Sequence, residues 1–167
     1  MIIVMNGSCG VGKSTIAREL TAKRKDALYI EGDTLNKMFD INDYSAKFDI
    51  THSNLLALCN NLISRGIKNI IVDYVFESID AMCNFSRGIN VLEICNIHFV
   101  TLFCSLEENL RRNSMRNSSN IMSEERIMYL NEIMGIIVKR GFGLCIDTTY
   151  KSVPHVVKII NAITHWG

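Results

Sequence analysis

Short apolar runs alternate with amphipathic segments along the whole chain. The runs are rich in Ile, Val and Leu and have the length of buried strands. They cover residues 2–5, 27–30, 70–76, 97–104 and 144–146. Between them, apolar residues recur at helical spacing, as Ile16, Ala17 and Leu20 do. This alternation predicts an α/β fold, in which helices cover both faces of a parallel sheet.

Local signals mark where the helices begin and end. Ser105 and Glu108 have the spacing of a capping box, and Pro154 suits the first turn of the last helix. Gly66 and Gly141 follow apolar stripes and are typical of helix ends. Residues 40–52 are polar and aperiodic, so we expect a loop there.

Composition narrows the class of protein. The chain has 167 residues, 48% of them hydrophobic, which suits a single domain over 1–167. The net charge is +1, so no broad basic surface is expected for nucleic acid. No apolar stretch is long enough to span a bilayer, and no secretion signal is recognised. Six cysteines lack C-x-x-C spacing and predict reduced thiols, which fits a cytoplasmic protein.

The most specific motif lies directly after the first apolar run. Residues 7–14 read G-S-C-G-V-G-K-S, a complete match to the Walker A pattern G-x-x-x-x-G-K-[ST]. Its glycines allow a nest of inward N–H groups, its lysine can reach nucleotide phosphates, and its serine can ligate Mg²⁺. A strand before it and a helix after it disfavour a turn that binds nothing. The candidate nucleotide contacts are Gly7, Ser8, Cys9, Gly10, Val11, Gly12, Lys13, Ser14 and Thr15.

Two aspartates follow predicted strands. Ligands in open α/β sheets bind beyond the carboxyl ends of the strands. Asp33 is therefore a candidate to orient an acceptor hydroxyl, although it could also cap the next helical turn. Asp73 ends the run Ile70-Ile71-Val72 and has the form of a Walker B acid, which would hold Mg²⁺ together with Ser14.

Basic residues near a polar break at 117–120 are the next candidates. Arg112 and Arg116 are one helical turn apart and could clamp phosphates. Arg111 suits a solvated face, and Arg126 could either join the clamp or pair with the neighbouring Glu124 and Glu125. Two weaker signals complete the set. The loop of Asp147, Thr148 and Thr149 could touch a base, although turn chemistry explains the same residues. His52 could reach a substrate, but a surface histidine is the preferred interpretation.

With these residues in place, the chain resembles the small P-loop kinases of the nucleoside-monophosphate-kinase-like group. Its relatives are shikimate, gluconate and adenylylsulfate kinases and chloramphenicol phosphotransferase-like proteins. The resemblance rests on 7–14, the Gly32-Asp33 pair, Asp73, the Arg112/Arg116 pair and 147–149. It implies a three-layer α/β/α fold with a five-stranded parallel sheet of order 2-3-1-4-5, a short lid at about 112–126, and ATP–Mg²⁺ as donor.

The resemblance also implies roles for individual residues. The catalytic candidates are Lys13, Asp33, Arg112 and Arg116, and the metal candidates are Ser14 and Asp73. Arg112, Asp147 and Thr148 join the nucleotide contacts. An acceptor-side loop at about 40–52, with Asp43, Tyr44, Lys47 and His52, is expected to influence acceptor choice.

The expected activity is transfer of the γ-phosphate of ATP to a hydroxyl or phosphate of a small molecule, by a monomer or homodimer. Two alternatives stay open. One is a nucleotide-binding switch or ATPase that acts on a protein partner, and the other is a polynucleotide 5′-kinase. The acceptor is undefined, because the chain has no Gly-Gly-Gly segment like that of shikimate kinases and only a short polar lid.

Overall fold

The computed structural model describes residues 1–89, 96–117 and 120–166. Its centre is a parallel sheet of five strands in the order β2-β3-β1-β4-β5, as the resemblance implied. The strands are β1 (Ile2–Gly7), β2 (Ala27–Glu31), β3 (Asn69–Asp73), β4 (Ile97–Phe103) and β5 (Leu144–Asp147). The fold class predicted from the alternating pattern is therefore confirmed.

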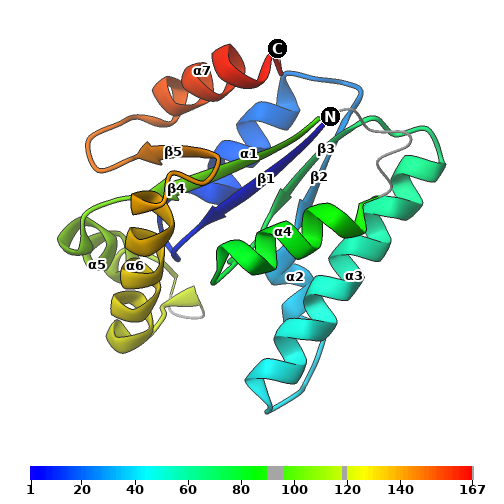
Figure 1. Cartoon of the computed structure of the whole chain (residues 1–167). Helices are drawn as coiled ribbons and strands as arrows, with labels where there is room; N and C mark the ends of the chain where they lie inside the picture. The colour runs from blue at the N-terminus through cyan, green and yellow to red at the C-terminus, as the bar shows by residue number, and fades with distance from the viewer. Residues whose placement is uncertain (90–95, 118–119, 167) are drawn as a thin grey trace.

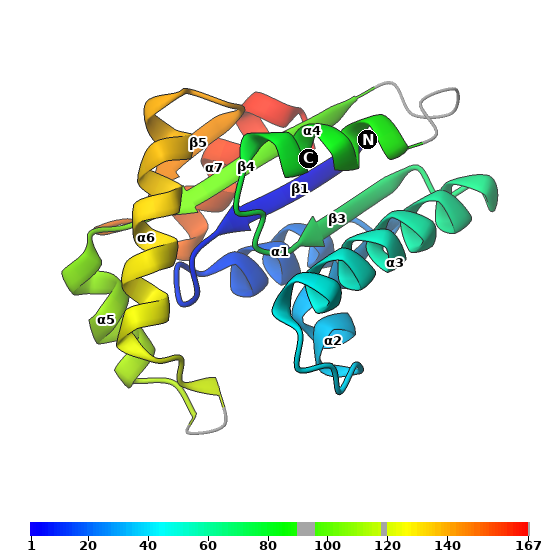
Figure 2. The same cartoon turned by 60° about the horizontal axis from the view of Figure 1, so that its bottom comes forward.

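Helices cover both faces of the sheet (Figure 1). They are α1 (Lys13–Ala22), α2 (Gly32–Lys37), α3 (Tyr44–Ser64), α4 (Ile79–Gly88), α5 (Leu106–Ser114), α6 (Glu124–Lys139) and α7 (Val153–Thr164). One face packs against α3, α4 and α6, and the other against α1 and α7. Figure 2 shows that α2, the start of α3 and the start of α6 project past the carboxyl ends of the strands.

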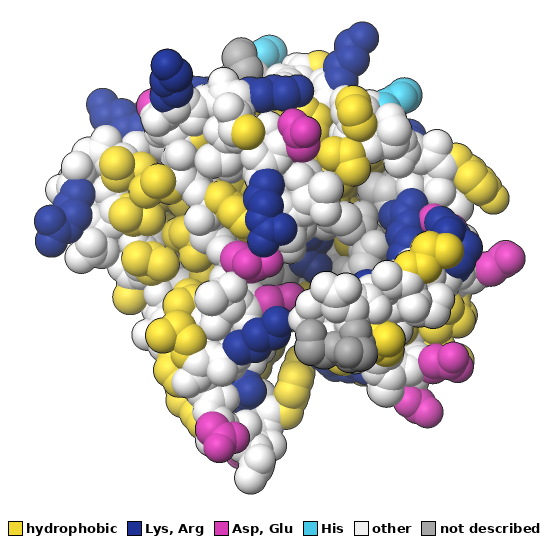
Figure 3. Space-filling view, turned by 180° about the vertical axis from the view of Figure 1, so that it is seen from behind, with side chains coloured by type: hydrophobic (Ala, Val, Ile, Leu, Met, Phe, Trp, Pro, Cys, Tyr) yellow, Lys and Arg dark blue, Asp and Glu magenta, His cyan; other side chains and the backbone are white. Residues whose placement is uncertain are grey.

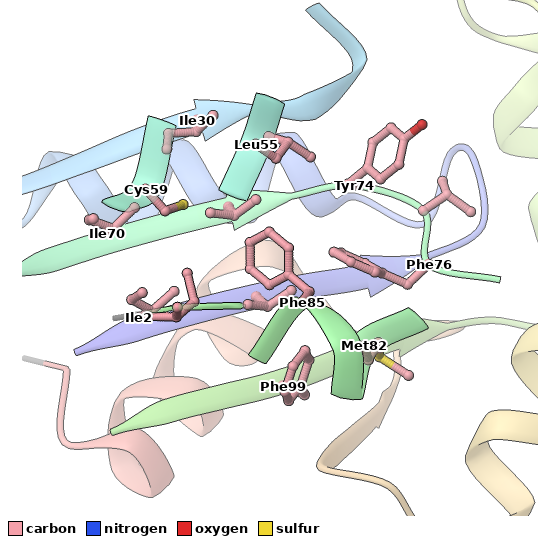
Figure 4. Packing of buried hydrophobic residues seen from close by; sticks show 14 of the residues in the cluster. Ile2, Ile30, Leu55, Cys59, Ile70, Tyr74, Phe76, Met82, Phe85 and Phe99 are labelled. Atoms are coloured by element: carbon pink, nitrogen blue, oxygen red, sulfur yellow. The ribbon is translucent and has the colours of Figure 1, made fainter. Parts of the chain in front are cut away.

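The central strand β1 is buried along its whole length. Side chains alternate across a strand, so Ile2 and Val4 join the cluster beneath α3, α4 and α6, whereas Ile3 and Met5 join the one beneath α1 and α7. Figure 4 shows the first cluster, with Ile2 at one end, Phe85 of α4 in the middle, and Tyr74 and Phe76, which follow β3, at the other end. Two packed faces fix β1, and with it the loop that begins at its end.

The segment 40–52 corrects our prediction, because most of it is helical. Helix α3 begins at Tyr44, and the Asp43 carboxylate accepts a hydrogen bond from the Ala46 N–H at 3.1 Å. Of the first two turns, only one side packs on the molecule, through Phe48 and the fully buried Thr51. The apolar stripe is too narrow to be recognised in the sequence.

Other boundaries differ less. Ser105 is an N-cap, as its capping-box spacing predicted, and Gly66 and Gly141 follow helix ends with positive φ. Ser123 and Ser152 are the N-caps of α6 and α7. The strand expected over 70–76 ends at Asp73, and α5 ends at Ser114, before the polar break at 117–120.

Two further findings bear on the predicted class of protein. Within the described ranges, no helix is long and apolar enough to cross a membrane. The cysteines in those ranges are free thiols, namely Cys9, Cys59, Cys83, Cys104 and Cys145, whereas Cys95 lies outside the described residues.

Candidate active site

The loop between β1 and α1 is curled around its own lysine. The Lys13 ammonium is buried and donates to the carbonyl oxygens of Gly7 at 2.9 Å and Ser8 at 3.1 Å. Gly10 and Gly12 have φ of 81° and 100°, a backbone conformation that favours glycine. Gly12 is also the N-cap of α1, so the positive end of the helix dipole faces the loop. This is an anion-binding geometry.

Beside the loop, a serine and an aspartate form a direct hydrogen bond. The Ser14 hydroxyl donates to Oδ2 of Asp73 at 2.7 Å. Asp73 is only 2% exposed, and this burial raises the pKa of its carboxyl group, although Lys13 and Ser14 act in the opposite direction. A hydroxyl and a carboxylate oxygen are the hard ligands that Mg²⁺ prefers. The pair therefore fits Mg²⁺.

Sequence reasoning missed a tyrosine at this position. The buried hydroxyl of Tyr29, on β2, lies beside Ser14 and Asp73. Burial is the main cause that raises its pKa. The run Ala27–Ile30 indicated a strand, but nothing in it indicated which face would carry the tyrosine.

Three connected pockets lie along the carboxyl end of the sheet. The loop pocket, of about 330 Å³, lies over the loop and is lined by Lys13, Ser14 and Thr15 among others. The α7-side pocket, of about 220 Å³, includes Val11, Thr148 and Lys151 in its lining and shares Gly10, Gly12, Thr15 and Arg112 with the loop pocket. The α2–α6 pocket, of about 350 Å³, shares Cys9, Asp33 and Arg116 with the loop pocket. Figure 3 shows the surface hollowed beside the lobe that carries the start of α3, with acidic and basic side chains in the hollow.

Asp33 lies at the junction of the loop pocket and the α2–α6 pocket. It is exposed in the first turn of α2, and its carboxylate has no hydrogen-bond or ion-pair partner among the described residues. The alternative that Asp33 caps this helix is wrong, because Glu31 occupies the N-cap position. Gly32 brings α2 close to β3, since a Cβ there would lie 2.6 Å from the Asp73 carbonyl oxygen.

The two candidate arginines face different surroundings. Arg112 donates to Glu108 at 2.6 Å and to the Thr148 carbonyl at 2.8 Å, which ties α5 to the loop after β5. Arg116 lines both the loop pocket and the α2–α6 pocket, and its guanidinium has no polar partner in the described ranges. Arg111 is exposed and pairs with Glu108, as expected of a solvated face.

The remaining predicted residues are placed as follows. The Asp147 carboxylate is exposed and accepts from the Thr149 N–H at 2.8 Å, which is turn chemistry. Thr148 is buried and lines the α7-side pocket. His52 is partly buried rather than exposed. It packs between Phe48 and Phe76, and this burial lowers its pKa to about 4.

An ion pair at the far wall of the α2–α6 pocket was also missed. Arg126 does not pair with Glu124 or Glu125, but bonds Oε1 of Glu77 at 2.5 Å across 49 residues of sequence. Tyr44 and Tyr129 donate to the same carboxylate, Tyr129 at 3.0 Å. Such long-range polar contacts produce no periodic signal in a sequence.

Comparisons with known proteins agree with this geometry. Residues 2–132 match the AAA domain family, whereas no curated protein matches. A gluconokinase from Sinorhizobium meliloti 1021 shares the fold with a TM-score of 0.67 and 17% identity, over 93% of this chain and 86% of that one. A shikimate kinase from Bacteroides thetaiotaomicron has a TM-score of 0.65 and 14% identity, over 99% and 98%.

A chain of the Pnkp1/Rnl/Hen1 RNA repair complex also shares the fold, with a TM-score of 0.69 and 17% identity. The match covers 83% of this chain but only 45% of that one. At these identities, the solved structures establish the fold. The sequence belongs to the AAA domain family, and its fold is that of the small P-loop kinases.

Proposed function

We propose that the chain is an ATP-dependent kinase that phosphorylates a small molecule. The observation that carries this proposal is the position of Asp33, whose carboxylate has no partner in the described ranges and lies where the loop pocket meets the α2–α6 pocket. A donor phosphate over the loop and an acceptor hydroxyl in the α2–α6 pocket would meet at this residue. The single domain over 1–167, the lid at about 112–126 and the acceptor side at about 40–52 belong to the same proposal.

Each candidate residue has a physical role in this reaction. Ser14 and Asp73 would hold Mg²⁺, which when bound neutralises charge on the donor phosphates. Lys13 and Arg116 face the loop pocket and would stabilise negative charge that develops on the transferred phosphoryl group. Asp33 would orient the acceptor hydroxyl or accept its proton. Arg112 and Thr148 would contact the nucleotide from the α7-side pocket.

The fold shared with the RNA repair complex makes a polynucleotide 5′-kinase the second candidate. Such an enzyme needs a basic groove with stacking aromatics that stays open along the strand. Here Arg126 and Glu77 connect α6 to the segment after β3, and Tyr44 adds the start of α3. This connection at the far wall favours a small acceptor, as does the net charge of +1.

The proposal is tested by ADP release with ATP and Mg²⁺ across nucleosides, sugar acids, shikimate, phenicols and a 5′-hydroxyl oligonucleotide. We expect a small molecule to raise the rate by orders of magnitude and Asp33→Asn to abolish that rise. Asp80→Asn, an exposed aspartate on α4, is the matched control and should keep it. A rise with the oligonucleotide alone, or no rise with any acceptor, would overturn the proposal.

A further inference from the structure

The α2–α6 pocket is the part of the site whose ligand is undefined, and its charges indicate the kind of acceptor. The ionised side chains in its lining are Asp33, Lys37, Arg116 and Arg126. Three of these four are cations, so the pocket at first suggests an anionic acceptor such as a sugar acid. The surroundings of the three cations, however, argue against an anionic acceptor.

Arg126 is neutralised within the wall. Its guanidinium bonds the Glu77 carboxylate at 2.5 Å and lies over the rings of Tyr44 at 4.8 Å and Tyr129 at 5.2 Å. Burial acts to raise the pKa of Glu77, but hydrogen bonds from Tyr44 and Arg126 hold that pKa below its ordinary value. Glu77 is therefore ionised at neutral pH, and its charge offsets that of Arg126.

The other two cations, Lys37 and Arg116, are also unavailable to an anionic acceptor. The Lys37 ammonium donates to Oδ1 of Asn120 at 3.2 Å, and Asp33, one turn earlier on α2, adds one negative charge to the same lining. Arg116 lines the loop pocket as well, where a donor phosphate would attract it. Apart from Arg116, the positive charges of Lys37 and Arg126 are matched in number by the negative charges of Asp33 and Glu77.

Apart from the amides of Asn36 and Asn120, most of the remaining lining is aromatic or apolar. Tyr74 is 3% exposed, and Figure 4 shows its hydroxyl pointing away from the buried cluster. This hydroxyl accepts from the Asn36 amide at 3.1 Å. Behind the ring lie Phe48, Phe76 and the neutral His52. Val75, Ile121, Met122 and Leu130 complete the lining.

We propose that the acceptor is an uncharged hydroxyl compound with a flat, partly apolar body, such as a nucleoside or an aryl alcohol, and that sugar acids and phosphate esters are excluded. The balanced charges leave a bound anion without a counterion, whereas the exposed ring of Tyr44 and the exposed side chain of Ile121 can pack against a planar body. The cavity of about 350 Å³ suits a molecule of that size. This inference rests on the proposed kinase activity.

The test compares matched pairs of acceptors that share the reacting hydroxyl. The pairs are thymidine with its 3′-monophosphate, methyl shikimate with shikimate, and sorbitol with gluconate. Measured as ADP release, kcat/KM should be at least tenfold higher for the uncharged member of each pair that reacts, and thymidine should exceed sorbitol. Lys37→Met should leave the preference for the uncharged member of each pair in place. Glu77→Gln leaves Arg126 uncompensated and should raise kcat/KM for the anionic member at least fivefold.

A preference for anionic members that Lys37→Met abolishes would overturn the inference and leave the kinase activity standing. A preference for thymidine 3′-monophosphate would instead favour a polynucleotide substrate. If no compound releases ADP, the proposed function fails, and this inference fails with it. Thermal unfolding of Glu77→Gln identifies a folding defect, and Lys37→Met, at an exposed position, keeps the test valid in that case.

Discussion

Asp73 shows at the scale of one residue how a metal site opposes stability. Its carboxyl group is buried beside Ser14, and burial raises its pKa. A raised pKa in the folded state means that the ionised form is less favourable there than in the unfolded chain. The contribution of Asp73 to the free energy of unfolding therefore decreases as pH rises from the ordinary pKa of an aspartate through the raised pKa of the folded state. At neutral pH, the side chain costs stability.

We expect Asp73→Asn to raise the melting temperature of the metal-free protein at pH 7 by a few degrees, because the amide keeps the shape without the charge. The same change should lower phosphoryl transfer by roughly 10²-fold or more, since a ligand for Mg²⁺ is lost. Thermal unfolding and ADP release measure the two effects. Asp49→Asn, at an exposed position on α3, is the control. A lower melting temperature for Asp73→Asn would contradict this account.

At the scale of the element, the start of α3 depends on its N-cap. The Asp43 side chain accepts from the Ala46 N–H, and Tyr44 next to it bonds Glu77 at the wall of the α2–α6 pocket. Asp43→Ala should cost about 1 kcal/mol, which corresponds to a fall of roughly 2–4 °C in the melting temperature. The displaced tyrosine should raise the acceptor KM several-fold and leave the ATP KM unchanged.

Asp43→Asn separates capping from charge, because asparagine caps a helix as well as aspartate does. It should retain both the melting temperature and the acceptor KM. An equal rise in both KM values for Asp43→Ala would show that the start of α3 does not act on the acceptor side alone.

Near the end of α5, the side chain of Asn113 bonds the backbone of Met122, which precedes α6. The buried amide of Asn113 donates to the Met122 carbonyl at 2.8 Å and accepts from the Met122 N–H at 3.0 Å. Asn113→Ala leaves both backbone groups without this partner, so we expect a loss of about 1–3 kcal/mol and faster proteolysis between α5 and α6. Ser114→Ala, at the exposed neighbouring position, is the control. Unchanged proteolysis would contradict this role.

At the scale of the whole molecule, the sequence predicts features that neighbouring residues determine, and it does not predict contacts between residues far apart in the chain. The phosphate loop could be located because strand, glycines and helix are contiguous, and the order of elements followed from alternating apolar runs. The first turns of α3 could not, because few of their side chains pack inward. The bond between Arg126 and Glu77 could not either, since two charged residues 49 positions apart carry no pattern. The donor side was therefore predictable, and the walls of the α2–α6 pocket were not.

The stability of the whole molecule should depend on acid through His52. Its ring packs against Phe48, Tyr74 and Phe76, and its Nε2 is buried without a partner in the described residues. Burial lowers its pKa from 6.5 to about 4. Between these values the unfolded chain binds the proton more readily, so the free energy of unfolding falls as pH falls through that window.

His52→Phe removes the titrating group and extends the aromatic cluster. We expect the melting temperature of the variant to equal or exceed that of the wild type at pH 7, and to decline less between pH 6.5 and pH 4.5. Thermal unfolding across that range measures the difference. His155→Phe, at an exposed position on α7, should decline as the wild type does. If His52→Phe declined as steeply as the wild type, the acid sensitivity would have to come from the carboxylates, and His52 would serve only as a packing residue.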